Sequence, residues 1–300
     1  MKQKNIPLKR ISSKKEIIPK DNSFIIYLII IFIIIQIIGL IVSNYYSKTG
    51  AVRGVITSDP NDIVNALFII GEILVFTGVL LLLKKYFKSG NYLFVFEFLA
   101  LFAGMVVVFQ IFLSYLISML LAFVLLWIKS ILSNHITKFK KINLWFNNFL
   151  LGIAIAGAGS IIGLSLGILP VIIFLILLSI YDIIAVFYTK HMVVLAKMFI
   201  KKKIALTFSI PSKKKIYQLG GGDIVVPLVV SSSYLFLLLK YVSFNIAIIP
   251  IIGIWVASLL GLVWTFYVLQ KGNIKVMPAL PPQAILMLSV IIISYVLLIA

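Results

Sequence analysis

Apolar runs of membrane-spanning length recur along almost the whole 300-residue chain, and they constrain its fold more than any other feature. A helix needs about 20 mostly apolar residues to cross the hydrocarbon core of a bilayer. Inside that core every backbone polar group must find a partner within the protein, so we expect these runs to be helices. The sequence therefore predicts an all-α, polytopic membrane protein with one membrane domain.

Nine such runs lie between charged or turn-rich breaks. They cover about residues 24–43, 63–83, 91–109, 111–128, 146–164, 167–189, 222–239, 244–269 and 283–299. The third and fourth runs carry no charge between Glu97 and Lys129, and together they are too long for one crossing, so we divide them near Phe109 and Gln110. We expect a basic tail at 1–23, helices one to five in 24–164, and helices six to nine in 165–300.

Lysine and arginine are distributed very unevenly between the two sides that this pattern defines. With the N-terminus inside, 24 of the 27 basic residues face the inner side, and Lys48, Arg53 and Lys240 face the outer side. Positive residues favour the cytoplasmic side, so we expect the N-terminus inside and, after nine crossings, the C-terminus outside. The basic loop at 190–219 is then cytoplasmic.

The net charge of +19 is interpreted in the same way. In a membrane protein, lysine clusters beside the spans act as topology signals and contact anionic lipid headgroups at the inner face. We therefore expect an integral multi-pass protein of the cell membrane, and no nucleic-acid partner.

Several other kinds of chemistry are excluded. The chain has no cysteine, so it has no disulfide, thiol nucleophile or iron–sulfur cluster. Residues 163–167 match the G-x-S-x-G pattern, but Ser165 falls near a helix end without a histidine beside it. His135 and His191 lie in or beside separate inner loops, outside any H-E-x-x-H motif, so no zinc site and no cofactor are expected.

Glycine spacing predicts one close helix contact. Gly159, Gly163 and Gly167 follow one another at intervals of four, on one helix face. Small residues at this spacing let the backbones of two membrane helices approach closely. We expect this face to pack against another helix.

Two aspartates stand out because a carboxylate near hydrocarbon is costly and usually functional. Asp182 lies within the sixth run, and Asp223 follows Gly220, Gly221 and Gly222 at the start of the seventh. The three glycines and Pro227 predict a loosely formed helix start there. The two runs are antiparallel and both aspartates lie toward their inner end, so packing could bring the carboxylates together.

Two neighbouring carboxylates suit peptide hydrolysis. Like charges disfavour double ionisation, so such a pair shares a proton near neutrality. The ionised member can then take a proton from water while the protonated member donates to the scissile carbonyl. The sequence spacing permits this arrangement and leaves open whether the carboxylates meet.

Three motifs in order resemble those of a known family. Tyr181-Asp182 is similar to its YD motif, residues 220–223 to its GxGD motif, and residues 278–280, within the proline-rich segment Met277–Pro282, to its PAL motif. The family is that of presenilins and signal peptide peptidases, which are intramembrane aspartyl proteases. The residues that flank both aspartates are more similar to those of signal peptide peptidases, whereas the N-inside orientation is similar to that of presenilins.

The resemblance implies a presenilin-like fold of nine helices and an intramembrane aspartyl endopeptidase that needs no cofactor. It implies that Asp182 and Asp223 are catalytic. The residues that it implies for shaping the site and holding an extended substrate are Tyr181, Gly220, Gly221, Gly222, Pro278, Ala279 and Leu280. Gly221 departs from the family pattern, which usually has leucine there.

The partners implied are single-span transmembrane proteins or signal peptides, bound by strand addition. A second copy of the chain is a further partner that the sequence permits. The alternative function is a proton- or cation-coupled transporter or ion leak, in which Glu72 and Glu97 join the two aspartates along a polar path. Both glutamates are also compatible with structural pairing inside the bundle.

Overall fold

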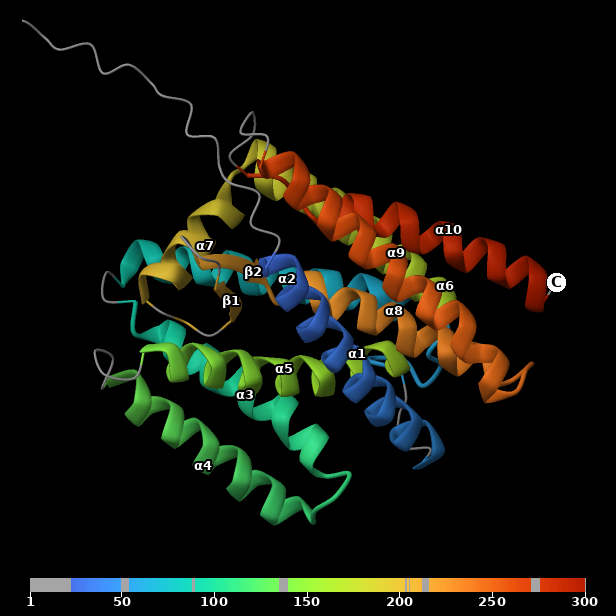
Figure 1. The fold of residues 1–300 in the computed structure, drawn as a ribbon, viewed down its shortest axis with the longest axis horizontal. Helices are drawn as coiled ribbons and strands as arrows, with labels where there is room; N and C mark the ends of the chain where they lie inside the picture. Colours follow the sequence, from blue (N-terminus) through green and yellow to red (C-terminus); the bar gives the residue numbers. More distant parts are fainter. Residues whose placement is uncertain are drawn as a thin grey trace, which may run out of the picture.

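The computed structural model describes residues 23–49, 54–87, 90–134, 140–202, 204, 206–211, 216–270 and 276–299. Most of the predicted basic tail, residues 1–22, lies outside this set, as do Lys203, Lys213–Lys215, Lys271 and Lys275. Long helices lying side by side dominate the described chain (Figure 1).

The elements follow the chain in this order. They are α1 (Ser23–Thr49), α2 (Ile63–Tyr86), α3 (Tyr92–Phe109), α4 (Tyr115–Asn134), α5 (Lys140–Ser165), α6 (Ile168–Ile183), the π-helix η1 (Ile184–Tyr188), α7 (His191–Lys202), β1 (Thr207–Pro211), β2 (Ile216–Gly220), α8 (Gly222–Leu238), α9 (Phe244–Gln270) and α10 (Leu280–Leu298).

Eight helices of the described chain are long and apolar enough to cross a membrane: α1 to α5, α6 with η1, α9 and α10. Each lies on a predicted run, and the predicted break near Phe109 is confirmed by the turn between α3 and α4. The remaining run, 222–239, forms α8, whose 17 residues make a helix about 25 Å long. This is less than the roughly 30 Å of a hydrocarbon core, so the nine-span topology stays a prediction.

The short helix α8 lies at the centre of the bundle. It packs against α1, α5, α6 and α9. Every residue from Val226 to Leu235 is buried. Because neighbours cover it on several sides, the start of α8 is held firmly relative to the other helices.

Glycines of α5 allow the closest of these contacts. A Cβ atom at Gly163 would lie 2.5 Å from the carbonyl oxygen of Val229 and 2.6 Å from Cβ of Ser232. A Cβ atom at Gly159 would lie 2.9 Å from Leu228. The predicted glycine face is confirmed for these two positions, whereas Gly167 contacts Asn61 in the connection before α2.

Two helices lie at the edge of the bundle. α2 packs mainly against α6, and α4 packs against α3 and α5. A buried ion pair joins α3 to α4, with Lys129 Nζ 2.6 Å from Glu97 Oε1. This ion pair favours the structural interpretation of Glu97.

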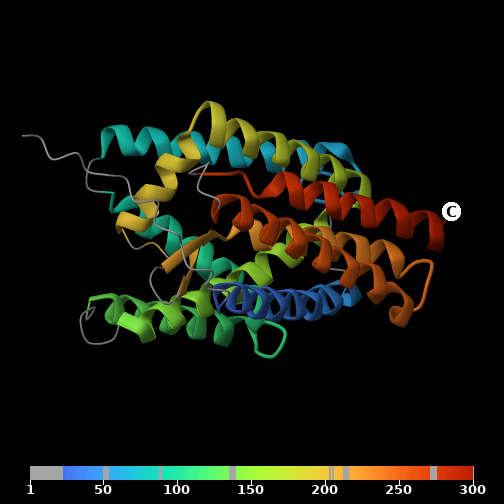
Figure 2. The same cartoon turned by 45° about the horizontal axis from the view of Figure 1, so that its top comes forward.

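The segment 190–219 is more ordered than the basic loop that we expected. It forms α7 and an antiparallel hairpin, in which Thr207 faces Gly220 and Pro211 faces Ile216. Figures 1 and 2 place both at the end of the bundle opposite the end of α10. The prediction of an all-helical bundle is confirmed, and the hairpin is a local exception that the sequence analysis missed. Its alternate apolar residues, Phe208 and Ile210, are buried at a strand's period of two.

Candidate active site

Asp182 lies near the end of α6, one residue before the helix widens into η1. π-helical turns interrupt α-helices mostly as short insertions, often at functional sites. Only 9% of Asp182 is exposed, and its Oδ2 accepts a hydrogen bond of 3.2 Å from the backbone N–H of Leu280. The PAL-like segment therefore holds the Asp182 side chain.

Asp223 lies in the first turn of α8, which follows β2 almost directly. Asp223 is half-buried, and its Oδ2 lies beside Gly220. It also interacts electrostatically with Asp182. The packing of α6 against α8 thus brings the two carboxylates within reach of each other's charge.

Only one of the three glycines before Asp223 is closely packed. Gly221 has φ −60° and ψ −29°, and α8 begins regularly at Gly222, so the expected loose helix start is not observed. A Cβ atom at Gly220 would make an ordinary contact of 3.4 Å with Asp223 Oδ2, and one at Gly222 would meet no atom within 4 Å. At Gly221 it would lie 3.1 Å from Ile155 Cδ1 and 3.3 Å from the carbonyl oxygen of Leu206, so these neighbours would have to shift slightly.

The proline-rich segment is shorter than expected. α10 begins at Leu280, so Pro281 and Pro282 lie in its first turn, whereas we predicted them in an extended segment. Proline is tolerated there because the first N–H groups of a helix have no intrahelical partner. Pro278 and Leu280 are buried, and Ala279 is half-buried.

A side chain that the motifs do not include fixes this segment. Gln283 Nε2 donates to the carbonyl oxygen of Ala279 at 3.1 Å, and its Oε1 accepts from Ser258 Oγ of α9 at 2.7 Å. A buried amide is costly unless it is hydrogen-bonded, so both contacts favour one position of the Ala279–Leu280 backbone. Gln283 therefore supports the donor that holds Asp182.

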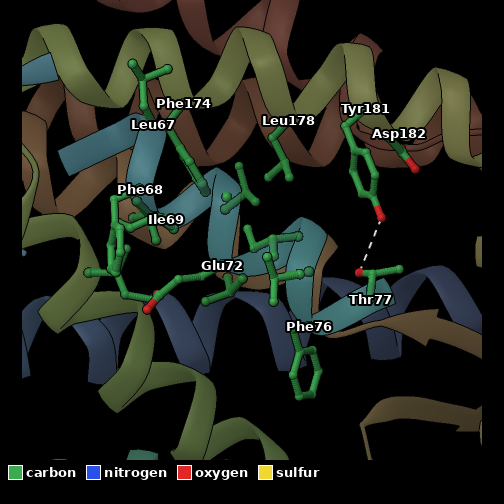
Figure 3. A pocket seen from close by; sticks show the side chains of 18 of the residues that line it. Leu67, Phe68, Ile69, Glu72, Phe76, Thr77, Phe174, Leu178, Tyr181 and Asp182 are labelled. Carbon is green, nitrogen blue, oxygen red and sulfur yellow. Dashed lines mark hydrogen bonds between the residues drawn. The ribbon is translucent and has the colours of Figure 1, made fainter. Parts of the chain in front are cut away.

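A cavity of about 1400 Å³ opens beside Asp182, between α2, α6, α8 and Leu280 (Figure 3). The polar side chains that line it are Glu72, Thr77, Tyr181 and Asp182, and the other lining residues are apolar or glycine. Gly222 lines it next to Asp223. An apolar cavity of this size suits a peptide segment better than a hydrated ion.

One edge of the hairpin is already occupied. Asn148 of α5 donates from Nδ2 to the carbonyl oxygen of Ser209 and accepts from its N–H, both at 2.9 Å. The backbone groups of Ser209 therefore point away from β2, so those of Gln218, its partner in the register, point away from β1. Of the two edges, β2 is the one open to a further strand among the described residues.

Replacing Asn148 with alanine is expected to loosen the hairpin, because it removes both hydrogen bonds to Ser209. The loss amounts to about 1–2 kcal/mol of local stability. Hydrogen exchange should become faster at the amides of 207–211 and 216–220. Asn91→Ala is the matched control, because the Asn91 side chain makes no capping hydrogen bond; equal exchange in both variants would contradict the role of Asn148.

Sequence reasoning missed two further contacts at the site. Gln36 of α1 is fully buried and donates from Nε2 to the carbonyl oxygen of Ile224 at 3.0 Å. Its amide within an isoleucine-rich span was a usable signal, because such a group needs a partner. The Tyr181 hydroxyl contacts Thr77 and His191, and no spacing in the sequence indicated that contact.

Comparison with known proteins agrees with this geometry. The family model described as signal-peptide peptidase, presenilin aspartyl protease matches residues 29–300. A solved structure of a presenilin family intramembrane aspartate protease in space group C222 superposes with a TM-score of 0.62 at 23% identity, covering 91% of this chain and 99% of that one. A second, in space group P2, gives a TM-score of 0.58 at 23% identity and covers 90% and 97%. No curated protein matches the sequence significantly.

Proposed function

The chain belongs to the signal-peptide peptidase and presenilin family of aspartyl proteases, and from that premise we propose that Asp182 and Asp223 are its catalytic pair. The reaction is hydrolysis of a peptide bond within a membrane-spanning segment. The main support is that Asp182 lines a large apolar cavity, that Gly222, which precedes Asp223, lines it as well, and that α6 packs against α8. The N–H of Leu280 in the PAL-like segment holds the Asp182 carboxylate.

The chemistry needs one proton shared by the pair. The ionised carboxylate takes a proton from water, and the resulting hydroxide attacks the scissile carbonyl carbon. The protonated carboxylate donates to the carbonyl oxygen. In the collapse of the tetrahedral intermediate the ionised carboxylate takes back one hydroxyl proton, and the amine leaves with the proton of the other carboxyl group, so the pair again holds one proton. The N–H group of Leu280 keeps the Asp182 carboxylate oriented through these steps.

The substrate would lie in the cavity as an unwound strand next to β2. Strand addition satisfies the backbone of an unwound segment, which hydrocarbon cannot do. Asn148 occupies the β1 edge, so the β2 edge at Gln218 is the one that remains for this pairing. Single-span proteins and signal peptides are the substrate classes that fit this mode.

The proposed topology has nine crossings, with α8 as the short seventh, the N-terminus in the cytoplasm and the C-terminus outside. The two aspartates then lie toward the cytoplasmic side, where lysines contact anionic headgroups. This orientation favours substrates whose N-terminus is outside. Efficient cleavage of only the opposite orientation would contradict it.

The test is reconstitution of the pure protein in liposomes with single-span substrates of both orientations, and mapping of the products by mass spectrometry. We expect one or a few cuts within the membrane segment, inhibited by a transition-state mimic of aspartyl proteases. Aspartate-dependent proton or cation flux without any cut would instead support the transporter alternative.

A further inference from the structure

The Tyr181 hydroxyl joins three segments of the chain at the position next to Asp182. It lies 2.9 Å from Nε2 of His191, the first residue of α7. It also lies 3.3 Å from Oγ1 of Thr77 on α2, the contact drawn in Figure 3. One phenol on α6 thus connects the helices α2 and α7 beside the proposed catalytic carboxylate.

The surrounding hydrogen bonds define the state of the imidazole. Thr189 Oγ1 donates to the carbonyl oxygen of Ile184 at 3.1 Å and lies 2.6 Å from His191 Nδ1. A hydroxyl has one proton, so Thr189 accepts from Nδ1–H. In a neutral imidazole Nε2 then carries a lone pair, and the single proton of the Tyr181 hydroxyl can be donated either to Nε2 at 2.9 Å or to Thr77 Oγ1 at 3.3 Å. We assign it to Nε2, the shorter of the two contacts. Burial lowers the pKa of His191, which favours this neutral form.

The backbone between Asp182 and His191 departs twice from the α-helix. It widens into η1, and Lys190 then adopts a φ of 55°, which is costly for a residue with a side chain. Such a conformation persists when surrounding contacts over-determine it. The hydrogen bond between Tyr181 and His191 closes this segment into a loop.

We propose that His191 is a positioning residue: by accepting the Tyr181 hydrogen bond from α7, it fixes the end of α6 that carries Asp182. This inference rests on the proposed function and adds to it a residue outside the three motifs. Without the contact, α6 could move relative to the Leu280 N–H that holds Asp182. A displacement of about 1 Å at a reacting group can cost on the order of 10²-fold in rate.

Protonation of His191 reverses the hydrogen bond. Nε2–H becomes a donor, so the Tyr181 oxygen must accept and its proton turns toward Thr77. The titratable group that contacts the imidazole is Tyr181 of α6, which is adjacent to Asp182 in the sequence, and Lys190 precedes His191 in the connector. The neutral Thr77 hydroxyl of α2 contacts Tyr181. The acceptor role of His191 is therefore present when the imidazole is neutral and lost as the pH falls.

Two substitutions of His191 distinguish loss of the hydrogen bond to Tyr181 from a general effect on folding. Glutamine can place its amide oxygen near the position of Nε2 and accept from Tyr181, whereas the amide of asparagine reaches only to the level of Nδ1. We expect His191→Asn to lower kcat about tenfold with little change in KM, and His191→Gln to keep most of kcat. The control is Lys197→Gln, which changes an exposed residue of the same helix. Wild-type kcat in His191→Asn, or equal losses in both variants, would overturn the proposal.

The pH profile adds a readout that a merely structural role would not move. Glutamine does not titrate, and the aspartate pair is common to both proteins. The ratio of His191→Gln activity to wild-type activity should therefore rise as the pH falls through the pKa of His191. A ratio independent of pH would contradict the role of the neutral imidazole.

Imidazole NMR tests the contact without any activity. The chain has two histidines, so His135→Gln leaves His191 as the single imidazole in the spectrum. We expect the Nδ1–H tautomer, and Tyr181→Phe should raise the pKa of His191 by removing a donor to its neutral form. An unchanged pKa would refute the contact. If the wild type cuts no substrate, the proposed function fails, while this measurement still decides whether the contact exists.

Discussion

Asp182→Asn and Asp223→Asn should each lower kcat for a single-span substrate by about 10³-fold or more, because neither amide can carry or transfer the shared proton. Asparagine has nearly the shape of aspartate, so at position 182 the backbone donor at Leu280 should still hold the side chain. The alanine variants should be equally inactive while the protein is still expressed. Product formation measured by mass spectrometry at saturating substrate gives the ratio.

The matched control for this loss is Asp62→Asn. Asp62 caps α2 by accepting from the N–H of Val64, a role that asparagine can also fill. It lies in the connection before α2 and does not itself line the cavity. Retained cleavage in either Asp182→Asn or Asp223→Asn would refute the proposed pair, whatever the control shows.

Gly163→Ala is expected to destabilise the protein by about 1–3 kcal/mol, because the added methyl group overpacks the contact between α5 and α8. The new Cβ would lie 2.5 Å from the carbonyl oxygen of Val229, which belongs to a buried helix with little freedom to move. The expected observation is a lower midpoint of thermal unfolding in detergent. Cleavage should fall as well, since α8 carries Asp223.

Gly78→Ala makes the same chemical change where no atom lies within 4 Å of the added Cβ. Alanine favours a helix over glycine by about 1 kcal/mol, so this variant should be neutral or slightly stabilised. Equal midpoints for the two variants would show that α5 and α8 can separate without cost, contrary to the packing described above.

Hydropathy predicted the helices well because each run is long, and hydrocarbon permits few alternatives to a helix. The secondary structure of residues 190–219 was harder to predict. Their lysines dominate the composition, while the strands depend on only a few alternating positions, including Phe208 and Ile210. Short segments of this kind are decided by the surface on which they pack, here α5 with Asn148.

The residues of the candidate site that carry the chemistry were predictable from their type. The hydrogen bonds that join residues far apart in the sequence were not. The two aspartates were identifiable because intramembrane carboxylates are costly. The contact between Leu280 N–H and Asp182 joins residues 98 positions apart, and that between Gln36 and Ile224 joins residues 188 apart. No local sequence pattern predicts contacts between residues so far apart in the sequence. The glycines were singled out from the sequence, but only Gly221 is closely packed, against Ile155, and the start of the helix shows no loosened dihedrals.

The length of α8 has a consequence for how the protein responds to its lipid. A helix of about 25 Å cannot bring both ends to the two headgroup layers of a bilayer whose core is about 30 Å thick. Because longer helices surround α8, thickening the bilayer would bury the end that bears Asp223 more deeply, and thinning it would bring that end closer to water. Acyl-chain length thereby becomes a control on how readily water reaches the carboxylates, through hydrophobic mismatch.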